Sequence, residues 1–218
     1  MAGMALAGTF GSRVQIGGEA ADLALDEPRG VLYVADFTRN NIEIVSLAAN
    51  QVVNSINVDP NPSSLSLSPD GRWLLVTHFG NNTVAPSDNV LTLIDLANQY
   101  AIKRFLLSAP PLGVAFGGDN LALVVTTTQF LLFDPVQGHA SVLDTTAAIH
   151  AKTLPAPAAS FPPDITTASV AASADGTRIY GMGDSSGTFT FSYDVSSHIV
   201  SPGGVILSSG VLGPRVVS

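Results

Sequence analysis

The residues that decide the fold are Pro62-Ser63-Ser64-Leu65-Ser66-Leu67-Ser68-Pro69-Asp70-Gly71-Arg72, followed by Trp73-Leu74-Leu75-Val76. The first part alternates serine with leucine, a period of two that is typical of a strand with one buried face. The pair Asp70-Gly71 supplies the positive φ that a tight hairpin turn requires. An uninterrupted apolar run follows, as in a buried strand. The stretch therefore predicts strand, turn, strand.

The same pattern occurs four times along the chain. Residues 25–34 repeat it upstream, with Val34 standing 42 residues before Val76, and two more copies lie at 114–124 and 170–180. Four antiparallel strands in a repeat of about 40–50 residues make one blade of a β-propeller. We expect a third strand in the copies at 42–47, 90–96, 130–134 and 189–195, and a fourth at 52–58, 101–107, 140–144 and 199–207.

These repeats predict an all-β protein, a propeller of about four blades. The blades are expected at about 19–58, 59–107, 108–145 and 164–209, and 147–163 form a proline-rich insert whose four prolines prevent regular structure. No stretch shows the sustained 3.6-residue period of a helix. Residues 1–18 are expected to hold a short leader, with 10–17 as the outer strand of a preceding blade, and 210–218 to begin a further blade. Such ends favour an incomplete ring over a closed ring of four.

The composition excludes several classes of function. Charged residues are only 12% of the chain and the net charge is −8, which argues against nucleic-acid binding. There is no cysteine, so disulfide frameworks and thiolate metal sites are excluded. No apolar run reaches the length of about 18 residues that a membrane span needs, so we predict no membrane insertion. Secretory signals carry a basic first region, whereas the first basic residue here is Arg13.

Two strings resemble the YVTN family of β-propeller repeats, which is related to the NHL and lactonase-like propellers. They are Tyr33-Val34-Ala35-Asp36 with Asn41-Ile42, and the string 62–72 with its Ser-Pro-Asp-Gly turn. The resemblance covers residues 20–207 and is weakest in the third copy. It implies a fold rather than a reaction, and rings of usually six to eight blades. Its members are frequent in bacterial envelope and extracellular proteins, which implies an extracellular or periplasmic location.

In a propeller, the loops between second and third strands and the loops between blades share one face, where ligands usually bind. We expect ligand-binding residues there, namely Asp36, Arg39, His78, Asn81, Asp164 and Asp184. Two of them, Asp36 and Asp184, carry carboxylates that would suit a divalent cation; otherwise we predict no cofactor. The alternative is that aspartate and asparagine occur here because they tolerate turn geometry.

Other conspicuous residues are expected to be structural. Asp95, Asp134 and Asp194 recur at one position, the end of the third strand, where a carboxylate can accept hydrogen bonds from the amides of the next turn. Trp73 opens a second strand and is expected to pack between blades rather than to present its ring to a ligand.

Three functions remain open. The first is a non-catalytic binding or scaffold module whose partner is a protein, peptide or glycan, with a homodimer completing the ring. The second, implied by the resemblance, is a lactonase-like hydrolase acting on a cyclic ester at the channel mouth. In that hydrolase Asp36 and Asp184 would bind metal or activate water and His78 would move a proton. The third is an architectural spacer in a larger protein. Neither a Gly-x-Ser-x-Gly elbow nor a Lys-containing phosphate loop is present.

Overall fold

The computed structural model describes residues 13–78, 89–153, 164–184 and 188–207. They form four separate four-stranded antiparallel sheets, here called blades 1 to 4, each with its strands in chain order. The predicted all-β class and blade arrangement are confirmed. The strands are β1 Ala20–Asp26, β2 Val31–Asp36, β3 Asn41–Ser46, β4 Gln51–Asn57, β5 Pro62–Leu67, β6 Trp73–His78, β7 Val90–Asp95, β8 Ala101–Leu106, β9 Pro111–Phe116, β10 Ala122–Thr126, β11 Gln129–Asp134, β12 His139–Thr145, β13 Thr167–Ala172, β14 Arg178–Asp184, β15 Thr188–Asp194 and β16 Ile199–Leu207.

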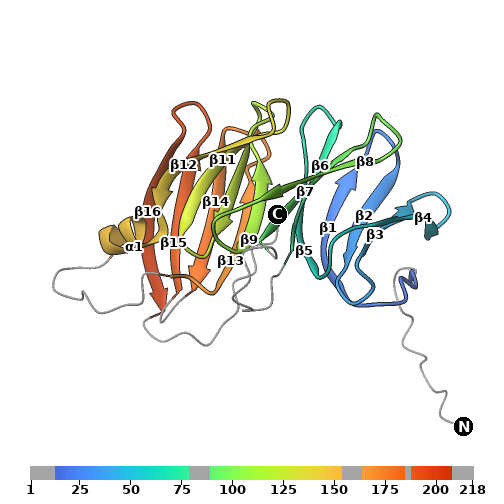
Figure 1. Ribbon diagram of the computed structural model, residues 1–218, viewed down its shortest axis with the longest axis horizontal. Helices are drawn as coiled ribbons and strands as arrows, with labels where there is room; N and C mark the ends of the chain where they lie inside the picture. The colour runs from blue at the N-terminus through green and yellow to red at the C-terminus, as the bar shows by residue number, and fades with distance from the viewer. Residues whose placement is uncertain (1–12, 79–88, 154–163, 185–187, 208–218) are drawn as a thin grey trace, which may run out of the picture.

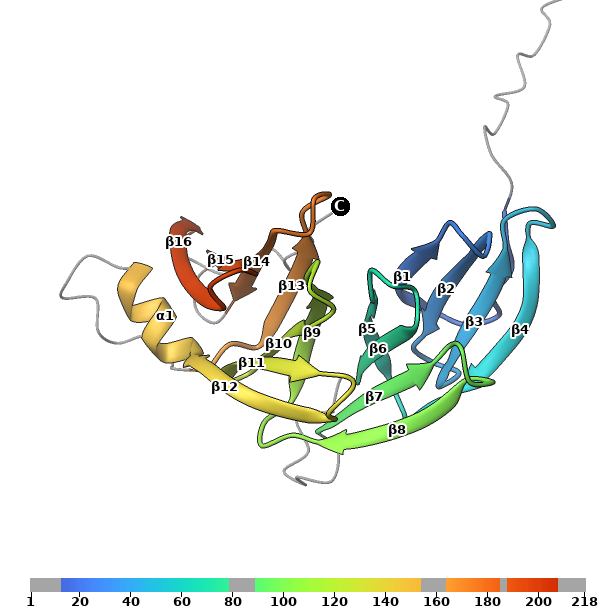
Figure 2. The same ribbon diagram turned by 90° about the horizontal axis from the view of Figure 1, so that it is seen from above.

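The blades stand side by side along an arc (Figures 1 and 2). Seen from above, the first strands β1, β5, β9 and β13 lie on the concave side and the fourth strands lie outside (Figure 2). Neighbouring blades touch through their first strands, β1 with β5, β5 with β9, and β9 with β13. Blades 1 and 4 stand at the two ends of the arc, on either side of its open part (Figure 2).

Apolar side chains pack between consecutive blades in three clusters. One joins Tyr33 and Ile42 of blade 1 to Leu74 of blade 2. The next contains Trp73, which is 5% exposed and packs between blades 2 and 3, as predicted. The third joins blades 3 and 4, where the rings of Phe130 and Phe191 meet edge to face at 4.8 Å. Strands β6, β7 and β10 of the inner blades are therefore buried on both faces.

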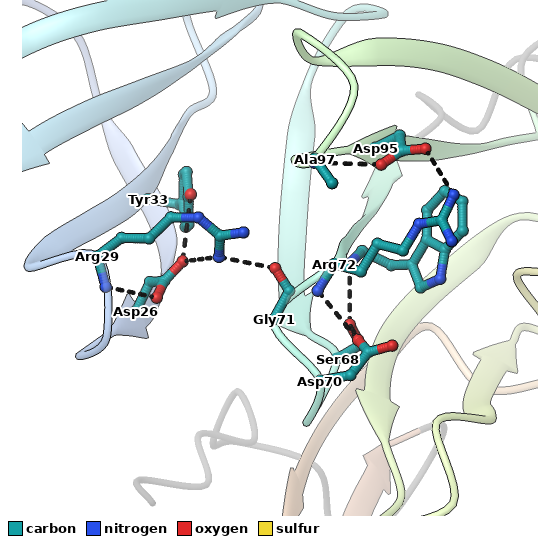
Figure 3. Close-up of polar contacts among 10 residues, drawn as sticks. Asp26, Arg29, Tyr33, Ser68, Asp70, Gly71, Arg72, Asp95 and Ala97 are labelled. Carbon is teal, nitrogen blue, oxygen red and sulfur yellow. Dashed lines mark hydrogen bonds and ion pairs between the residues drawn. The ribbon is translucent and has the colours of Figure 1, made fainter.

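Polar contacts join the blades at the end of the arc that carries the turns between first and second strands. Arg29 Nη1 donates hydrogen bonds to Asp26 Oδ2 and to the Gly71 carbonyl, both at 2.7 Å (Figure 3). The arginine thus links the first turn of blade 1 to the Asp-Gly turn of blade 2. At Gly71 the backbone φ is +68°, the left-handed value for which the sequence predicted a glycine.

The same kind of link continues along the arc. Asp70 N donates to Asn120 Oδ1 of blade 3 at 3.1 Å, and Gly118 N donates to the Gly176 carbonyl of blade 4 at 2.8 Å. A Cβ on Gly118 would meet the Gly176 backbone, which explains why glycines face each other there. The repeated turn therefore fixes the spacing of the blades as well as reversing the chain.

The aspartates that end the third strands hold the next turn, as predicted. Asp95 Oδ1 accepts a hydrogen bond from Ala97 N at 3.1 Å (Figure 3), and Asp134 and Asp194 accept equivalent bonds from turn amides. Asp95 also pairs with Arg72 at 3.2 Å, and the same guanidinium lies 4.4 Å from the Trp73 ring centre. These carboxylates are structural.

The first part of the proline-rich insert is helical, and the expectation of no regular structure is wrong there. Helix α1, Thr146–Thr153, ends before Pro155, so the prolines do not interrupt it. Thr145 Oγ1 caps its N-terminus by accepting a hydrogen bond from Ala148 N at 3.1 Å. Ile149 is fully buried in the core between blades 3 and 4. Two turns are too short to show a helical period. Residues 154–163 lie outside the described residues.

The expected outer strand of a preceding blade is not a strand in residues 13–17. This segment instead lies against blade 1, where Arg39 Nη1 donates to the Ile16 carbonyl at 3.2 Å and Phe37 N donates to the Glu19 carbonyl at 2.8 Å. Residues 1–12 and 210–218, expected to be a leader and the start of a further blade, lie outside the described residues. No helix among the described residues is long and apolar enough to span a bilayer.

A close approach between the neighbouring strands β14 and β15 supplies a first prediction. A Cβ on Gly181 would overlap the Phe191 ring inside the core, so Gly181→Ala should lower the free energy of unfolding by about 1–3 kcal/mol. Gly204→Ala is the matched control because nothing lies within 4 Å of a Cβ there. Denaturant melts of both variants test this. Equal stability of the two variants would contradict the close packing of β14 on β15.

Candidate functional site

The loop face is the end of the arc that carries the connections between second and third strands and between blades. Its described connections are 37–40, 58–61, 107–110, 127–128 and 164–166. The second strands end at this face in Asp36, His78, Thr126 and Asp184, as the repeats predicted. The structure thus has Asp36, His78 and Asp184 at one face, but it distributes them over different blades.

His78 is buried in a hydrogen-bonded chain between blade 2 and the loop that enters it. Its Nδ1 lies 3.1 Å from the Pro60 carbonyl and its Nε2 lies 2.8 Å from Thr92 Oγ1. Thr92 Oγ1 is 3.4 Å from Asp59 Oδ2, which accepts a hydrogen bond from Arg104 Nε at 2.6 Å. Because a carbonyl only accepts, Nδ1 carries the proton in neutral His78. Nε2 then accepts the single proton of the Thr92 hydroxyl, which in this form is not donated to the more distant Asp59 Oδ2.

This environment favours the neutral form of His78. Burial, the largest effect, lowers the pKa of His78 below its usual value of 6.5, although the Pro60 carbonyl and Asp59 act in the opposite direction. Both ring nitrogens already have partners, so the side chain holds the connecting loop 58–61 against blade 2. The geometry supports a positioning role for His78 and gives it no free nitrogen for a substrate.

Asp36 is fully buried at the corresponding place in blade 1. Its Oδ1 accepts hydrogen bonds from Arg39 N at 3.1 Å and from Thr38 Oγ1 at 3.3 Å. Its Oδ2 is buried and has no partner among the described residues. Gly18 lies directly against this carboxylate, since a Cβ there would overlap both oxygens. Asp36 therefore caps the loop that follows β2 and supports the segment that precedes β1.

Beside Asp36, a hollow of about 390 Å³ opens on the face of blade 1 that points away from blade 2. Asn41 and Glu43 form part of its wall and are only 8% and 4% exposed. Asn41 Oδ1 has no partner among the described residues, a condition that costs about 1–3 kcal/mol for a buried acceptor. The walls of this blade-1 hollow are Gln15, Ile16, Gly17, Arg39, Asn41, Glu43, Val52 and Ser55.

Arg39 was predicted at this site, whereas Asn41 and Glu43 were not. Arg39 Nη1 lies 3.9 Å from Glu43 Oε1, a long ion pair. The alternation Asn41-Ile42-Glu43-Ile44 places the two polar residues on one face of β3, which a sequence interpretation assigns to solvent. Residues 13–18 and strand β4 bury these two side chains. The sequence pattern of β3 alone does not show these contacts.

The remaining predicted residues do not gather with these. Asp184 ends β14 in blade 4, at the opposite end of the arc from Asp36 (Figure 2), and pairs with Thr167. Asp164 is exposed on the loop before β13, and Asn81 lies outside the described residues. Within the described part of the chain, no three His, Cys, Asp or Glu side chains are grouped so as to hold a metal ion. A cation on Asp36 and Asp184 stays a prediction.

The buried histidine predicts a pH dependence of stability. With its pKa lowered on folding, His78 binds fewer protons in the folded than in the unfolded chain, so acid favours unfolding. The free energy of unfolding should fall as pH drops from about 7.5 to about 5.5, and His78→Gln should remove part of that fall. His139→Gln, at an exposed histidine, should keep it. Denaturant melts at several pH values measure this; identical pH profiles for the wild type and His78→Gln would contradict it.

Comparison with known proteins supports the fold. No protein-family model matches the chain. Antigen Lp49 of Leptospira interrogans serogroup Icterohaemorrhagiae serovar copenhageni (strain Fiocruz L1-130) is 29% identical over 104 residues, which are 44% of this chain and 22% of Lp49. The chain thus spans about a fifth of the length of that curated relative.

Three solved structures are similar over most of the chain. Hydrazine synthase of Kuenenia stuttgartiensis has a TM-score of 0.67 and 15% identity over 94% of this chain and 53% of that one. The Cps50 (Swd1) β-propeller domain of Myceliophteria thermophila has a TM-score of 0.59 and 17% identity, over 84% of this chain and 54% of that one. The extracellular domain of the hybrid two-component system BT4673 of B. thetaiotaomicron has a TM-score of 0.62 and 14% identity, over 92% of this chain and 24% of that one. These likenesses show that the chain has the β-propeller fold.

Proposed function

We propose that this chain is a non-catalytic binding or scaffold propeller of the YVTN type, which presents its loop face to a protein, peptide or glycan. The blade-1 hollow carries the proposal. Its wall combines an amide, a carboxylate, a guanidinium and a hydroxyl, from Asn41, Glu43, Arg39 and Ser55. Such groups recognise a ligand through hydrogen bonds, and the volume lies in the range of about 300–1,000 Å³ usual for ligand sites.

The state of His78 also favours binding over hydrolysis. A lactonase-like reaction at this face would need a side chain that moves a proton to or from the substrate. Both nitrogens of His78 are bonded inside the blade, and Asp184 lies in another blade. No observation on the described residues favours the hydrolase.

A location outside the cytoplasm belongs to the same proposal. It rests on the YVTN resemblance and on the similar fold of the BT4673 extracellular domain.

A steric block of the hollow tests the proposed function. Ser55 is exposed on β4 and lines the hollow, so Ser55→Tyr should fill it without disturbing the core. Peptides and glycans captured by the wild-type chain on arrays should bind this variant at least about tenfold more weakly, an affinity change of about 1.4 kcal/mol.

Ser141→Tyr is the matched control, because Ser141 is exposed on β12, the corresponding fourth strand of blade 3. Its binding should equal that of the wild type. Arrays without a captured ligand, or ligands held equally by Ser55→Tyr, would overturn the proposal. Turnover of lactones by the chain would show that the propeller is catalytic.

We also propose a homodimer that completes the ring. Leu23 and Leu25 are 59% and 47% exposed on β1, and their neighbour Ala24 packs toward blade 2, so the two leucines face the open end of the arc. A second copy would cover them and, on the same face of blade 1, the hollow, so the dimer and a ligand in the hollow would exclude each other. Light scattering after size exclusion should give twice the chain mass, and Leu23→Ser with Leu25→Ser should give the chain mass. A wild-type monomer that melts cooperatively would contradict the dimer.

A further inference from the structure

We propose that the blade-1 hollow binds the cationic end of a lysine or arginine side chain of a partner peptide. This inference rests on the proposed function and names the ligand class. Its basis is a comparison of blades 1 and 2, which place different residues at equivalent positions beside the hollow.

Strand register identifies the equivalent positions. In blade 1, Val34 pairs with Glu43, which pairs with Ser55 on the fourth strand. In blade 2, Val76 pairs with Thr92, which pairs with Arg104. Ser55 thus occupies the position of Arg104, and Glu43 that of Thr92.

The guanidinium of Arg104 is paired in blade 2. It donates through Nε to Asp59 Oδ2 at 2.6 Å, beside Thr92. In blade 1 the position of Arg104 is held by Ser55, whose side chain is short. On the third strand, the carboxylate of Glu43 takes the place of the Thr92 hydroxyl. The blade-1 hollow therefore lies where blade 2 holds an arginine side chain, and its acidic group is Glu43 of the third strand, whereas that of blade 2 is Asp59 of the entering loop.

The charges around the hollow favour a cation. Glu43 in the wall is more than nine-tenths buried, whereas Arg39 is 54% exposed and 3.9 Å from Glu43. Arg39 also donates a hydrogen bond to the Ile16 carbonyl. One half-exposed guanidinium at that distance leaves the buried carboxylate incompletely paired. The chain as a whole carries a net charge of −8, which would attract a basic partner.

Hydrogen bonding points to the same ligand. Asn41 is buried in the wall and its Oδ1 lacks a partner among the described residues, so the hollow offers an acceptor in addition to Glu43. Ammonium and guanidinium groups carry donors only and match such acceptors. Ile16 and Val52 in the wall offer apolar contact to the aliphatic stem of such a side chain. A carboxylate ligand would face Glu43, and among the described residues no aromatic ring lines the hollow for a sugar to stack on.

The first test introduces a positively or negatively charged side chain at position 55, beside the hollow. Ser55→Arg restores the arginine of blade 2 and should raise the melting temperature by about 2 °C at low salt, an increase that high salt reduces. Ser55→Glu should lower it. Ser141→Arg and Ser141→Glu are matched controls at the exposed position on β12 and should change it little. Equal effects of Arg and Glu at position 55 would overturn the proposal without bearing on whether the propeller binds other ligands.

The second test uses the blocked tripeptides acetyl-Gly-Lys-Gly-amide, acetyl-Gly-Arg-Gly-amide and acetyl-Gly-Gln-Gly-amide, titrated with EDTA present and followed by NMR. The two cationic peptides should shift signals of residues around the hollow, and the glutamine peptide should not. Glu43→Gln should weaken this binding at least tenfold, Arg39→Gln should strengthen it, and Ser55→Tyr should abolish it. Glu27→Gln, an exposed acidic residue at the turn end of the arc, is the charge-matched control and should leave binding unchanged.

The outcomes separate the two proposals. Stronger binding to Glu43→Gln and weaker binding to Arg39→Gln would identify an anionic ligand and overturn this inference. The inference would also be overturned if the array ligands are glycans that bind the hollow and whose affinity neither Glu43→Gln nor Arg39→Gln changes. The proposed function would then still stand. NMR signals of residues around the hollow that shift on addition of Ca²⁺ alone, without a peptide, would identify a metal-ion site and would also overturn the inference.

Discussion

The packing of apolar side chains between consecutive blades is the constraint on which the rest of the structure depends. A four-stranded sheet has two faces, and the central strands of an inner blade bury both. β6 shows the result, because all of its residues from Trp73 to His78 are buried. Alternate residues serve opposite neighbours, Leu74 packing toward blade 1 and Leu75 toward blade 3. Each blade therefore depends on the next for its stability, as in other repeat proteins.

The loop face follows from that packing. A connecting loop must pass from the outer strand of one blade to the inner strand of the next, and its backbone needs hydrogen-bond partners. The residue at the end of the second strand can supply one, as His78 does for Pro60, and in blade 1 the equivalent Asp36 holds the loop from β2 to β3. The same position carries different chemistry in each blade because the loop, rather than a shared ligand, selects the residue.

The sequence predicted the features that are local and repeated. The alternation of β5, the Asp-Gly turn and the aspartates that end third strands each depend on neighbours within a few residues, so the strands and their ends were predicted closely. Helix α1 was missed because its two turns follow a strand without a period of their own, although Thr145 is a recognisable N-cap.

The blade-1 hollow was only half predicted, for a physical reason. Arg39 of its wall lies in a loop, where a polar residue is readily taken as a candidate for ligand binding. Asn41 and Glu43 lie in an alternating strand, and their burial depends on the segment 13–18 and on β4, contacts that a linear pattern does not contain. Likewise, the pattern places His78 at the loop face but does not show that Pro60 and Thr92 engage both of its nitrogens.

The difference between blades 1 and 2 shows how one scaffold yields a closed position and an open one. In blade 2 the loop 58–61 brings Asp59 to Arg104, and this pair together with His78 and Thr92 satisfies the polar groups beside it. In blade 1 the entering segment brings glycines, Gly17 and Gly18. Among the described residues Asn41 Oδ1 has no hydrogen-bond partner, and the Arg39–Glu43 pair is long at 3.9 Å. Ser55, at the place of Arg104, is too short to satisfy either group. An unsatisfied acceptor and a poorly paired carboxylate reduce the stability of the free chain. A ligand that supplies the missing donors recovers that free energy on binding, which is why the blade with the less complete polar network is the one suited to recognition.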